Sequence, residues 1–259
     1  MSTINVAADG HYAGNGSKHD VISRSGMVIF KVASNVATGD FHKTAIIENL
    51  IIDGRDSHGN ISAGSVGILL QNVYNCIIRN VTILNCEVGI QIENTGSYAS
   101  QSNRIEHVRM TNVNTGILFT ASAGNPGDFG FTTIKDVGIK LSDTVSSNVG
   151  IQNVGIQIGK SGNPVAKLYS SFIKATVWLG KNGVNSGMIV CGELKYSLVM
   201  FIVECPDGNL VTTGRLGVDI TNSSPNAVFN NQSFMLTYDN KRIVSYNLSS
   251  GHDIVTEIL

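Results

Sequence analysis

The chain has 259 residues, of which 42% are hydrophobic and only 14% are charged. This length is enough to bury a large core, which excludes a mini-protein held together by disulfides or metal ions. The formal net charge of -1 leaves no surplus of basic side chains, so we expect no nucleic-acid partner. The 28 glycines and the scarcity of Glu and Lys favour strands joined by tight turns.

The first residues, 1–19, predict a flexible lead-in. They contain no basic stretch followed by an apolar run, so we expect no secretory signal in them. Their glycine cluster does not match a phosphate-binding loop, because Ser17 separates Gly16 from Lys18 and no strand-turn-helix unit follows. The longest apolar run of the chain, residues 198–203, is too short to cross a bilayer, and we expect no insertion into a membrane.

An internal repeat organises residues 20–240. One pattern is a strand of the form Ile-x-x-(Leu/Val)-x-(Ile/Met), and the other is a strand that begins with glycine. The first pattern occupies residues 47–52, 78–83, 105–110 and 134–139, and the second occupies residues 67–70, 89–92, 116–119 and 155–158. Successive copies are often 11 residues apart, which gives a unit of about 22 residues, with weaker copies before and after this array. Short strands at this period predict the stacked coils of a parallel β-helix, about seven of them.

The register of the first pattern predicts columns of like side chains. Its apolar positions alternate with polar ones, as in strands that bury one face. The inward columns are Ile47, Ile78, Ile105 and Ile134, then Leu50, Val81, Val108 and Val137, then Ile52, Ile83, Met110 and Ile139. The outward column Glu48, Arg79, Glu106 and Lys135 alternates in charge, which favours this register. The next column, Asn49, Asn80, His107 and Asp136, predicts a hydrogen-bonded ladder at a corner of the coil.

Four cysteines stand singly, at spacings that match no zinc site, and predict small buried side chains. They are Cys76, Cys86, Cys191 and Cys205.

Residues 44–119, with phrases such as IIENLIIDG and VGIQIEN, resemble the pectate lyase-like superfamily. The resemblance implies an all-β fold, a right-handed single-stranded parallel β-helix, for the whole repeat region. This superfamily contains polysaccharide lyases, glycoside hydrolases, epimerases and the glycan-binding tail spikes of viruses. The chain lacks the Asn-Thr-Asp, Gly-His-Gly and Arg-Ile-Lys motifs of the polygalacturonase-type hydrolases. The resemblance therefore implies the fold more strongly than an activity.

Function in such a stack is expected in insertions that exceed the repeating unit. Three insertions stand out, at residues 54–66, 95–103 and 120–130, and we expect them to form one wall of a groove.

The first insertion and the residue before it bring together the candidate catalytic residues Asp53, Arg55, Asp56 and His58. A lyase site would use a carboxylate or Ca²⁺ to neutralise a uronate, and Arg or His to remove the proton next to the carboxyl group. The same residues also fit a simple chain reversal, with Asp-Gly and His-Gly-Asn as turn sequences. No metal site is expected outside the lyase alternative.

Candidate substrate-binding residues follow in the next two insertions. Tyr98, Phe129 and Phe131 offer aromatic faces for sugar rings, and Arg104, Asn125 and Asp128 offer hydrogen bonds to hydroxyl groups. Aromatic side chains at such positions also cap cores or contact partner chains.

Beyond residue 160 the strands become more apolar, which fits either core or a face for self-association. Residues 241–259 predict a final strand or cap. The resemblance to viral members implies a homo-oligomer, a trimer in many of them, in a virion or extracellular setting.

Two functions fit the sequence. The first is a polysaccharide-recognising β-helix protein of viral or cell-surface type, with glycan contacts in its loops. The alternative is a polysaccharide lyase or glycoside hydrolase that acts on an acidic polysaccharide. The lyase would use Ca²⁺ with Arg55, His58 or Arg104, and the hydrolase would use a pair from Asp53, Asp56, Asp128 and Asp136. A purely structural role in a virion or surface layer is a third reading.

Overall fold

The computed structural model describes most of the chain up to residue 204 and the backbone of five strands beyond it. The described residues are 2–7, 10–14, 21–34, 44–95, 99–122, 127–144, 146, 153–160, 166–180, 185–204, 216–219, 228–230, 232–238, 242–249 and 252–258. In these ranges every regular element is a β-strand, as the composition predicts.

The described strands form three sheets, which we name A, B and C. Sheet A contains, in spatial order, β1 (Ile4–Val6), β4 (Val28–Ala33), β6 (Ser62–Gln71), β8 (Cys86–Asn94), β12 (Thr115–Ala121), β15 (Asn153–Ile158), β18 (Asn185–Val190) and β21 (Leu216–Asp219). Sheet B contains β2 (Gly10–Ala13), β5 (Ala45–Asp53), β7 (Ile77–Leu84), β10 (Arg104–Glu106), β14 (Thr133–Leu141), β17 (Phe172–Trp178), β20 (Leu198–Glu204), β23 (Gln232–Tyr238), β24 (Arg242–Ser249) and β25 (His252–Ile258), with β3 (Val21–Ser23) beside β5 and β11 (Arg109–Val113) between β7 and β14. Sheet C contains β9 (Ala99–Gln101), β13 (Gly127–Gly130), β16 (Ala166–Tyr169), β19 (Glu193–Lys195) and β22 (Val228–Asn230).

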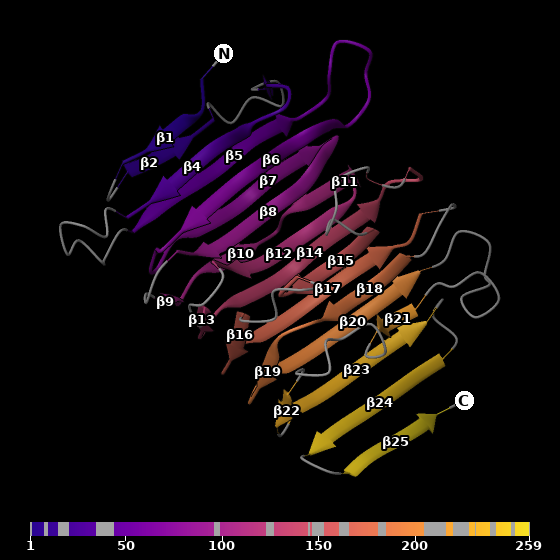
Figure 1. Cartoon of the computed structure of the whole chain (residues 1–259). Coiled ribbons are helices and arrows are strands. Elements are labelled where there is room, and N and C mark those ends of the chain that lie inside the picture. The colour runs from indigo at the N-terminus through magenta and orange to yellow at the C-terminus, as the bar shows by residue number, and fades with distance from the viewer. Residues whose placement is uncertain are drawn as a thin grey trace.

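The chain visits these sheets in a fixed order. From β8 onward each circuit runs from sheet A to sheet C, then to sheet B and back to sheet A. Up to β23, each strand pairs in parallel with its counterpart one circuit later, so the circuits stack from the indigo end to the yellow end of Figure 1. The prediction of an all-β chain with parallel strands is confirmed.

Sheet C is a feature that the sequence reading missed. Its strands are only three to four residues long, with sequences such as Ala-Ser-Gln and Gly-Asp-Phe-Gly that contain no β-branched residue. Such segments are typical of loops, and the sequence prediction placed them in insertions.

The predicted columns in sheet B are confirmed by the strand register. Ile47 pairs with Ile78, Ile78 with Ile105, and Ile105 with Ile134, and each is at most 1% exposed. The charged column also forms, because Glu48, Arg79, Glu106 and Lys135 lie at successive register positions. The Glu48 carboxylate pairs with the Arg79 guanidinium across the first step.

The polar column beside it bends sheet B at each circuit. Asn49, Asn80, His107 and Asp136 have φ values of 58, 52, 53 and 53°, a left-handed conformation that Asn and Asp tolerate best. The Asn80 Nδ2 donates to the Asn49 Oδ1 at 3.3 Å. The predicted ladder is therefore confirmed for its first step, from Asn80 to Asn49.

The glycines that begin the second pattern also stack, in sheet A. A Cβ atom on Gly116 would lie 2.5 Å from the Gly155 carbonyl oxygen, and one on Gly89 would lie 2.7 Å from the Gly116 carbonyl oxygen. A side chain at these positions would collide with the backbone of the next circuit, so the packing of the stack requires glycine here.

The predicted flexible lead-in is wrong for part of its length. Strand β1 pairs with β4, and β2 pairs with β5. Both segments carry apolar side chains that reach the core, and the Tyr12 ring meets the Phe30 ring edge-on at 4.8 Å. At the other end, β24 and β25 extend sheet B in antiparallel fashion.

The buried cysteines of the prediction are confirmed at three positions. Cys76, Cys86 and Cys191 are at most 1% exposed and form no disulfide with one another, and burial raises the pKa of the Cys76 and Cys86 thiols to about 12. Cys205 lies outside the described residues. The described part contains no helix that is long and apolar enough to span a membrane.

Candidate functional site

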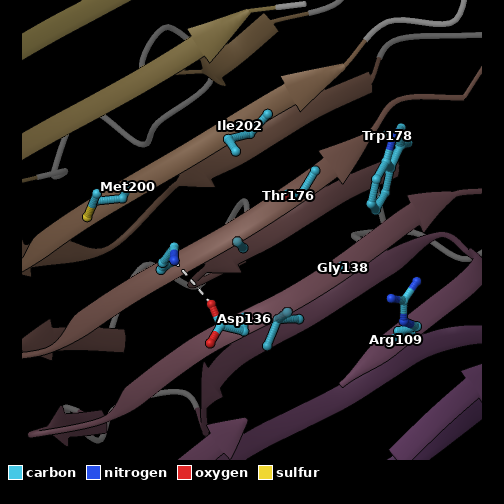
Figure 2. A pocket seen from close by; sticks show the side chains of 10 residues that line it. Arg109, Asp136, Gly138, Thr176, Trp178, Met200 and Ile202 are labelled. Carbon is cyan, nitrogen blue, oxygen red and sulfur yellow. Dashed lines mark ion pairs between the residues drawn. The ribbon is translucent and has the colours of Figure 1, made fainter. Parts of the chain in front are cut away.

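A groove crosses the outward face of sheet B, over strands β11, β14, β17 and β20. It encloses about 460 Å³ (Figure 2). The lining residues are Arg109, Asp136, Val137, Gly138, Lys174, Ala175, Thr176, Trp178, Met200 and Ile202. A second hollow of about 440 Å³ adjoins it and shares Arg109, Gly138 and Trp178.

Trp178, the single tryptophan of the chain, stands between the two hollows. It lies in register with Lys140 on the circuit before and with Glu204 on the circuit after. Its indole leans back over Gly138, where a Cβ atom would lie 3.1 Å from ring carbon Cζ3. The absence of a side chain at Gly138 therefore creates the space in which the ring lies, half-buried, along the sheet.

One side of the groove is apolar. On β20, Met200 pairs with Lys174 and Ile202 pairs with Thr176, and both apolar side chains project from the outward face (Figure 2). Leu198, on the same strand, is 42% exposed. This apolar strip continues the surface that the indole begins.

The other side of the groove is charged. The Lys174 Nζ lies 3.2 Å from the Asp136 Oδ1, and this neighbouring ammonium lowers the pKa of the Asp136 carboxyl. No ion pair within the described residues engages Arg109 or Lys140. Their exposed cationic groups, with the Glu204 carboxylate, surround the indole with hydrogen-bonding partners.

A half-buried indole flanked by apolar and hydrogen-bonding side chains suits a ligand with an apolar ring face and polar edges. Among the described residues, no three His, Cys, Asp or Glu side chains form a group that could hold a metal ion. The groove therefore presents an apolar surface and charged side chains side by side.

The predicted catalytic residue Asp53 lies at the end of β5 and is fully buried. Its carboxylate accepts from the Arg55 guanidinium at 2.5 Å and from the Asn85 Nδ2 at 2.9 Å. The Asn112 Nδ2 in turn donates to the Asn85 Oδ1 at 2.7 Å. Asp53 thus begins a ladder of polar side chains that joins three circuits.

Asp56 and His58 lie in a tight turn. The Asp56 Oδ1 accepts from the backbone N–H groups of His58 and Asn60, at 2.8 and 2.9 Å, and these hydrogen bonds lower the pKa of the Asp56 carboxyl. The His58 side chain is 82% exposed. All four candidates lie in one short segment. The Asp53 and Asp56 carboxylates both accept hydrogen bonds from backbone N–H groups within it and so stabilise its conformation.

The predicted substrate-binding residues fall in different environments. Arg104 is exposed and donates to the Glu106 carboxylate at 2.8 Å. Asp128 is half-buried in sheet C. Tyr98 and Asn125 lie outside the described residues.

The expectation for Phe129 is wrong. This side chain is fully buried, and its ring meets the Phe119 ring edge-on at 5.4 Å. Phe129 points inward because residues 127–130 form a strand rather than a loop tip.

The three insertions do not form one wall. Residues 54–61 connect sheet B to sheet A, whereas the other two insertions connect sheet A to sheet C. The repeat pattern predicts only two kinds of strand and no third sheet. For this reason the sequence analysis placed all three insertions on one side of the stack.

Sequence reasoning missed the groove. Its residues come from strands whose relative register shifts by one, because Ile134 pairs with Ile173 but Val137 pairs with Ala175. The one sequence feature that pointed to the groove was the sole tryptophan, Trp178, which belongs to a strand whose inward-facing residues are apolar.

No protein-family model matches the chain, and no curated protein matches it. Among solved structures, the chain is similar to ORF18 of Geobacillus virus E2, with a TM-score of 0.42 and 11% identity over 98% of this chain and 58% of that one. It is also similar to the catalytic domain of a GH87 α-1,3-glucanase in complex with nigerose, with a TM-score of 0.24 and 11% identity over 88% of this chain and 61% of that one. A third similar structure is tailspike protein 3 of bacteriophage CBA120, with a TM-score of 0.24 and 14% identity over 93% of this chain and 52% of that one. The chain spans 52% to 61% of the length of these structures, and similarity at this level assigns no function to it.

Proposed function

We propose that this protein is a right-handed parallel β-helix that recognises a polysaccharide along the groove of sheet B. The observation that carries the proposal is the Trp178 indole, held over Gly138 between two hollows that are lined by both apolar and charged side chains. A pyranose ring has an apolar face that stacks on an indole and hydroxyl groups that need hydrogen-bond partners. Arg109, Lys140 and Glu204 supply such partners around the ring.

The stacked circuits favour an extended ligand over a compact one. Each circuit adds about 4.8 Å along the stack, and the groove crosses the circuits of β11, β14, β17 and β20. A chain of sugars lying along the stack would contact successive strands in the same way.

Binding without cleavage is the function that the groove supports best. A glycoside hydrolase needs two carboxyl groups about 5–9.5 Å apart on either side of one bond. Asp136 and Glu204 line different hollows, and Asp136 is paired with Lys174. Among the described residues that line the first hollow, Asp136 is the one carboxylate, which supports binding over a catalytic pair of carboxyl groups.

The alternative, a lyase or hydrolase, would use the segment from Asp53 to His58. The contacts of Asp53 with Asn85 and of Asp56 with its own turn support a structural role for both carboxylates. Cleavage products are therefore the outcome that separates the two functions.

The experiment is retention of the purified protein in gels that contain dextran, galactomannan, xylan, polygalacturonate or hyaluronate, with and without Ca²⁺. We expect retention by at least one polysaccharide, and about two- to tenfold weaker retention of the Trp178→Ala variant, since one aromatic contact contributes about 0.5–1.5 kcal/mol. The matched control is His58→Ala, an exposed side chain outside the groove, which should bind like the wild type.

Three results would contradict this function. The first is no retention by any of the five polysaccharides, and the second is equal retention of the Trp178→Ala variant. The third is release of unsaturated or reducing ends from a polysaccharide, which would establish the enzymatic alternative.

A homotrimer would present three such grooves side by side and raise the apparent affinity for a repetitive glycan. We include the homotrimer in the proposal. Light scattering of the purified protein measures its mass in solution, and the mass of a monomer would overturn this part of the proposal.

A further inference from the structure

A second group of aromatic residues belongs to the segments where sheet C passes into sheet B. The short strands of sheet C form a row at one side of the stack (Figure 1). One residue of each circuit turns this corner in a left-handed conformation, with φ between 48 and 57°. These residues are Asn75, Ser102, Phe131, Ser170 and Tyr196. Backbone hydrogen bonds connect each circuit to the next here, such as Phe131 N–H to the Tyr169 carbonyl at 3.1 Å.

Phe131 and Tyr196 are unfavourable residues for this corner. A left-handed backbone costs a bulky residue free energy that Asn or Gly would spare. Burial does not compensate for that cost, because the two residues are 56% and 61% exposed. Residues held in such conformations cluster at ligand-binding sites.

A third ring completes the patch. Tyr169 lies one residue before the corner, and its ring meets the Phe131 ring edge-on at 5.8 Å. The Tyr169 ring also covers Gly130, where a Cβ atom would lie 2.5 Å from ring carbon Cζ. The Gln101 amide donates to the Tyr169 hydroxyl and fixes the ring in place.

The charges beside this aromatic corner neutralise one another. The Glu193 carboxylate lies 2.6 Å from the Lys195 Nζ and 4.0 Å from the Lys167 Nζ. Burial raises the pKa of the Tyr169 hydroxyl, and the nearby Asp128 carboxylate raises it further. The hydroxyl is therefore neutral and able to donate a hydrogen bond. The surface therefore offers aromatic faces, a hydroxyl and an amide beside charged side chains that pair with one another.

We propose that this aromatic corner, made of Phe131, Tyr169 and Tyr196, is a second sugar-binding site, which takes an uncharged pyranose. The inference rests on the proposed function for its ligand class, but it uses a different sheet and different residues. Aromatic faces beside a hydroxyl and an amide match the apolar face and hydroxyl edge of such a sugar. The two strained residues lie two circuits apart, about 9.6 Å along the stack, so that one glycan chain reaches both.

A protein partner fits this surface less well. The two exposed rings would bury about 150–250 Å² each, whereas a specific protein interface buries about 800 Å² on each partner. The area that the two rings supply is far below that of a protein interface, whereas one sugar ring needs only one aromatic face to stack on.

The test compares four proteins on gels of dextran, galactomannan and xylan. They are the wild type, Trp178→Ala, the double variant Phe131→Asn/Tyr196→Asn, and the combination of all three substitutions. Asn tolerates the left-handed corner, so the double variant keeps its fold. We expect retention on a neutral polysaccharide to weaken on the order of tenfold in the double variant and to disappear in the combined variant. The Trp178 fluorescence response of the double variant to small methyl glycosides should remain that of the wild type.

The outcomes separate this inference from the groove. Wild-type retention of the double variant overturns the inference, whether or not Trp178→Ala loses binding. Weakened retention of the double variant together with normal retention of Trp178→Ala supports the corner and overturns the groove. Absence of retention on all three gels overturns the inference. If the protein is retained only by the polygalacturonate or hyaluronate gels of the first experiment, the groove alone is supported.

Discussion

The Trp178 indole lies over Gly138 of the preceding circuit, at a separation that leaves no room for a larger side chain between them. The two residues are two register positions apart in adjacent parallel strands, since Gly138 pairs with Thr176 and Lys140 pairs with Trp178. The orientation of the ring is therefore a property of two circuits rather than of one residue.

Filling the space at Gly138 should move the ring without unfolding the stack. In Gly138→Val, the side chain would displace the indole into solvent, because the ring is the nearest neighbour and its χ angles can change. We expect a red-shifted Trp178 emission and polysaccharide retention as weak as that of Trp178→Ala. The control is Thr82→Val, on the same face of sheet B in an earlier circuit. Unchanged emission in Gly138→Val would contradict this relationship.

The glycine column of sheet A predicts a different response to a single methyl group. Gly116→Ala places Cβ against the Gly155 carbonyl oxygen, which belongs to the backbone and cannot turn aside. Overpacking of this kind costs about 1–3 kcal/mol, measured as the free energy of unfolding in urea. Gly138→Ala is the matched control, because its Cβ meets only a movable ring. Equal stability of the two variants would be inconsistent with the close stacking of the circuits.

The strained corner predicts a substitution that stabilises the fold. Tyr196→Asn should raise the free energy of unfolding by about 1 kcal/mol, because Asn adopts the left-handed backbone more readily and little burial is lost. Ser170→Asn, at the same corner, should change stability far less, since serine is small and exposed there. A destabilised Tyr196→Asn would show that the tyrosine supports the fold rather than a ligand.

Acid should weaken the first circuits through Glu48. Hydrogen bonds from Arg79 and His11 lower the pKa of the Glu48 carboxyl below its ordinary value of 4.5. This contribution to stability is fully present above that value and is lost as the pH falls through the lowered pKa. We expect urea unfolding to become easier as the pH falls below the ordinary value of 4.5, and Glu48→Gln to reduce that slope. An identical slope in the variant would mean that the ion pairs contribute nothing.

Much of the stack was predictable from the sequence, because successive circuits place the same kinds of side chain at the same positions of the core and the surface. Ile47, Ile78, Ile105 and Ile134 fill one column, and the alternating charges beside them give the register. The left-handed corner at Asn49 and Asn80 was also predictable as a ladder, since Asn suits both the backbone and the hydrogen bond.

The site was not predictable, for reasons of register. Asp136 adds a residue to β14 that β17 lacks, so the spacing from Ile134 to Ile139 exceeds that from Ile173 to Val177 by one. The repeat pattern therefore cannot place Trp178 over Gly138. The short strands of sheet C were missed for a different reason, because a segment such as Gly-Asp-Phe-Gly has the composition of a turn. That error turned the buried Phe129 into an expected sugar contact.

The most direct test of the groove is a fluorescence titration, because Trp178 is the only tryptophan and reports on no other site. The titrant is the polysaccharide that retains the protein most strongly, and the matched protein is Gly138→Val. A glycan stacked on the indole should shift and saturate the emission of the wild type and leave that of Gly138→Val almost unchanged. Saturable binding by calorimetry with no change in Trp178 emission would contradict the groove as the place where the polysaccharide binds.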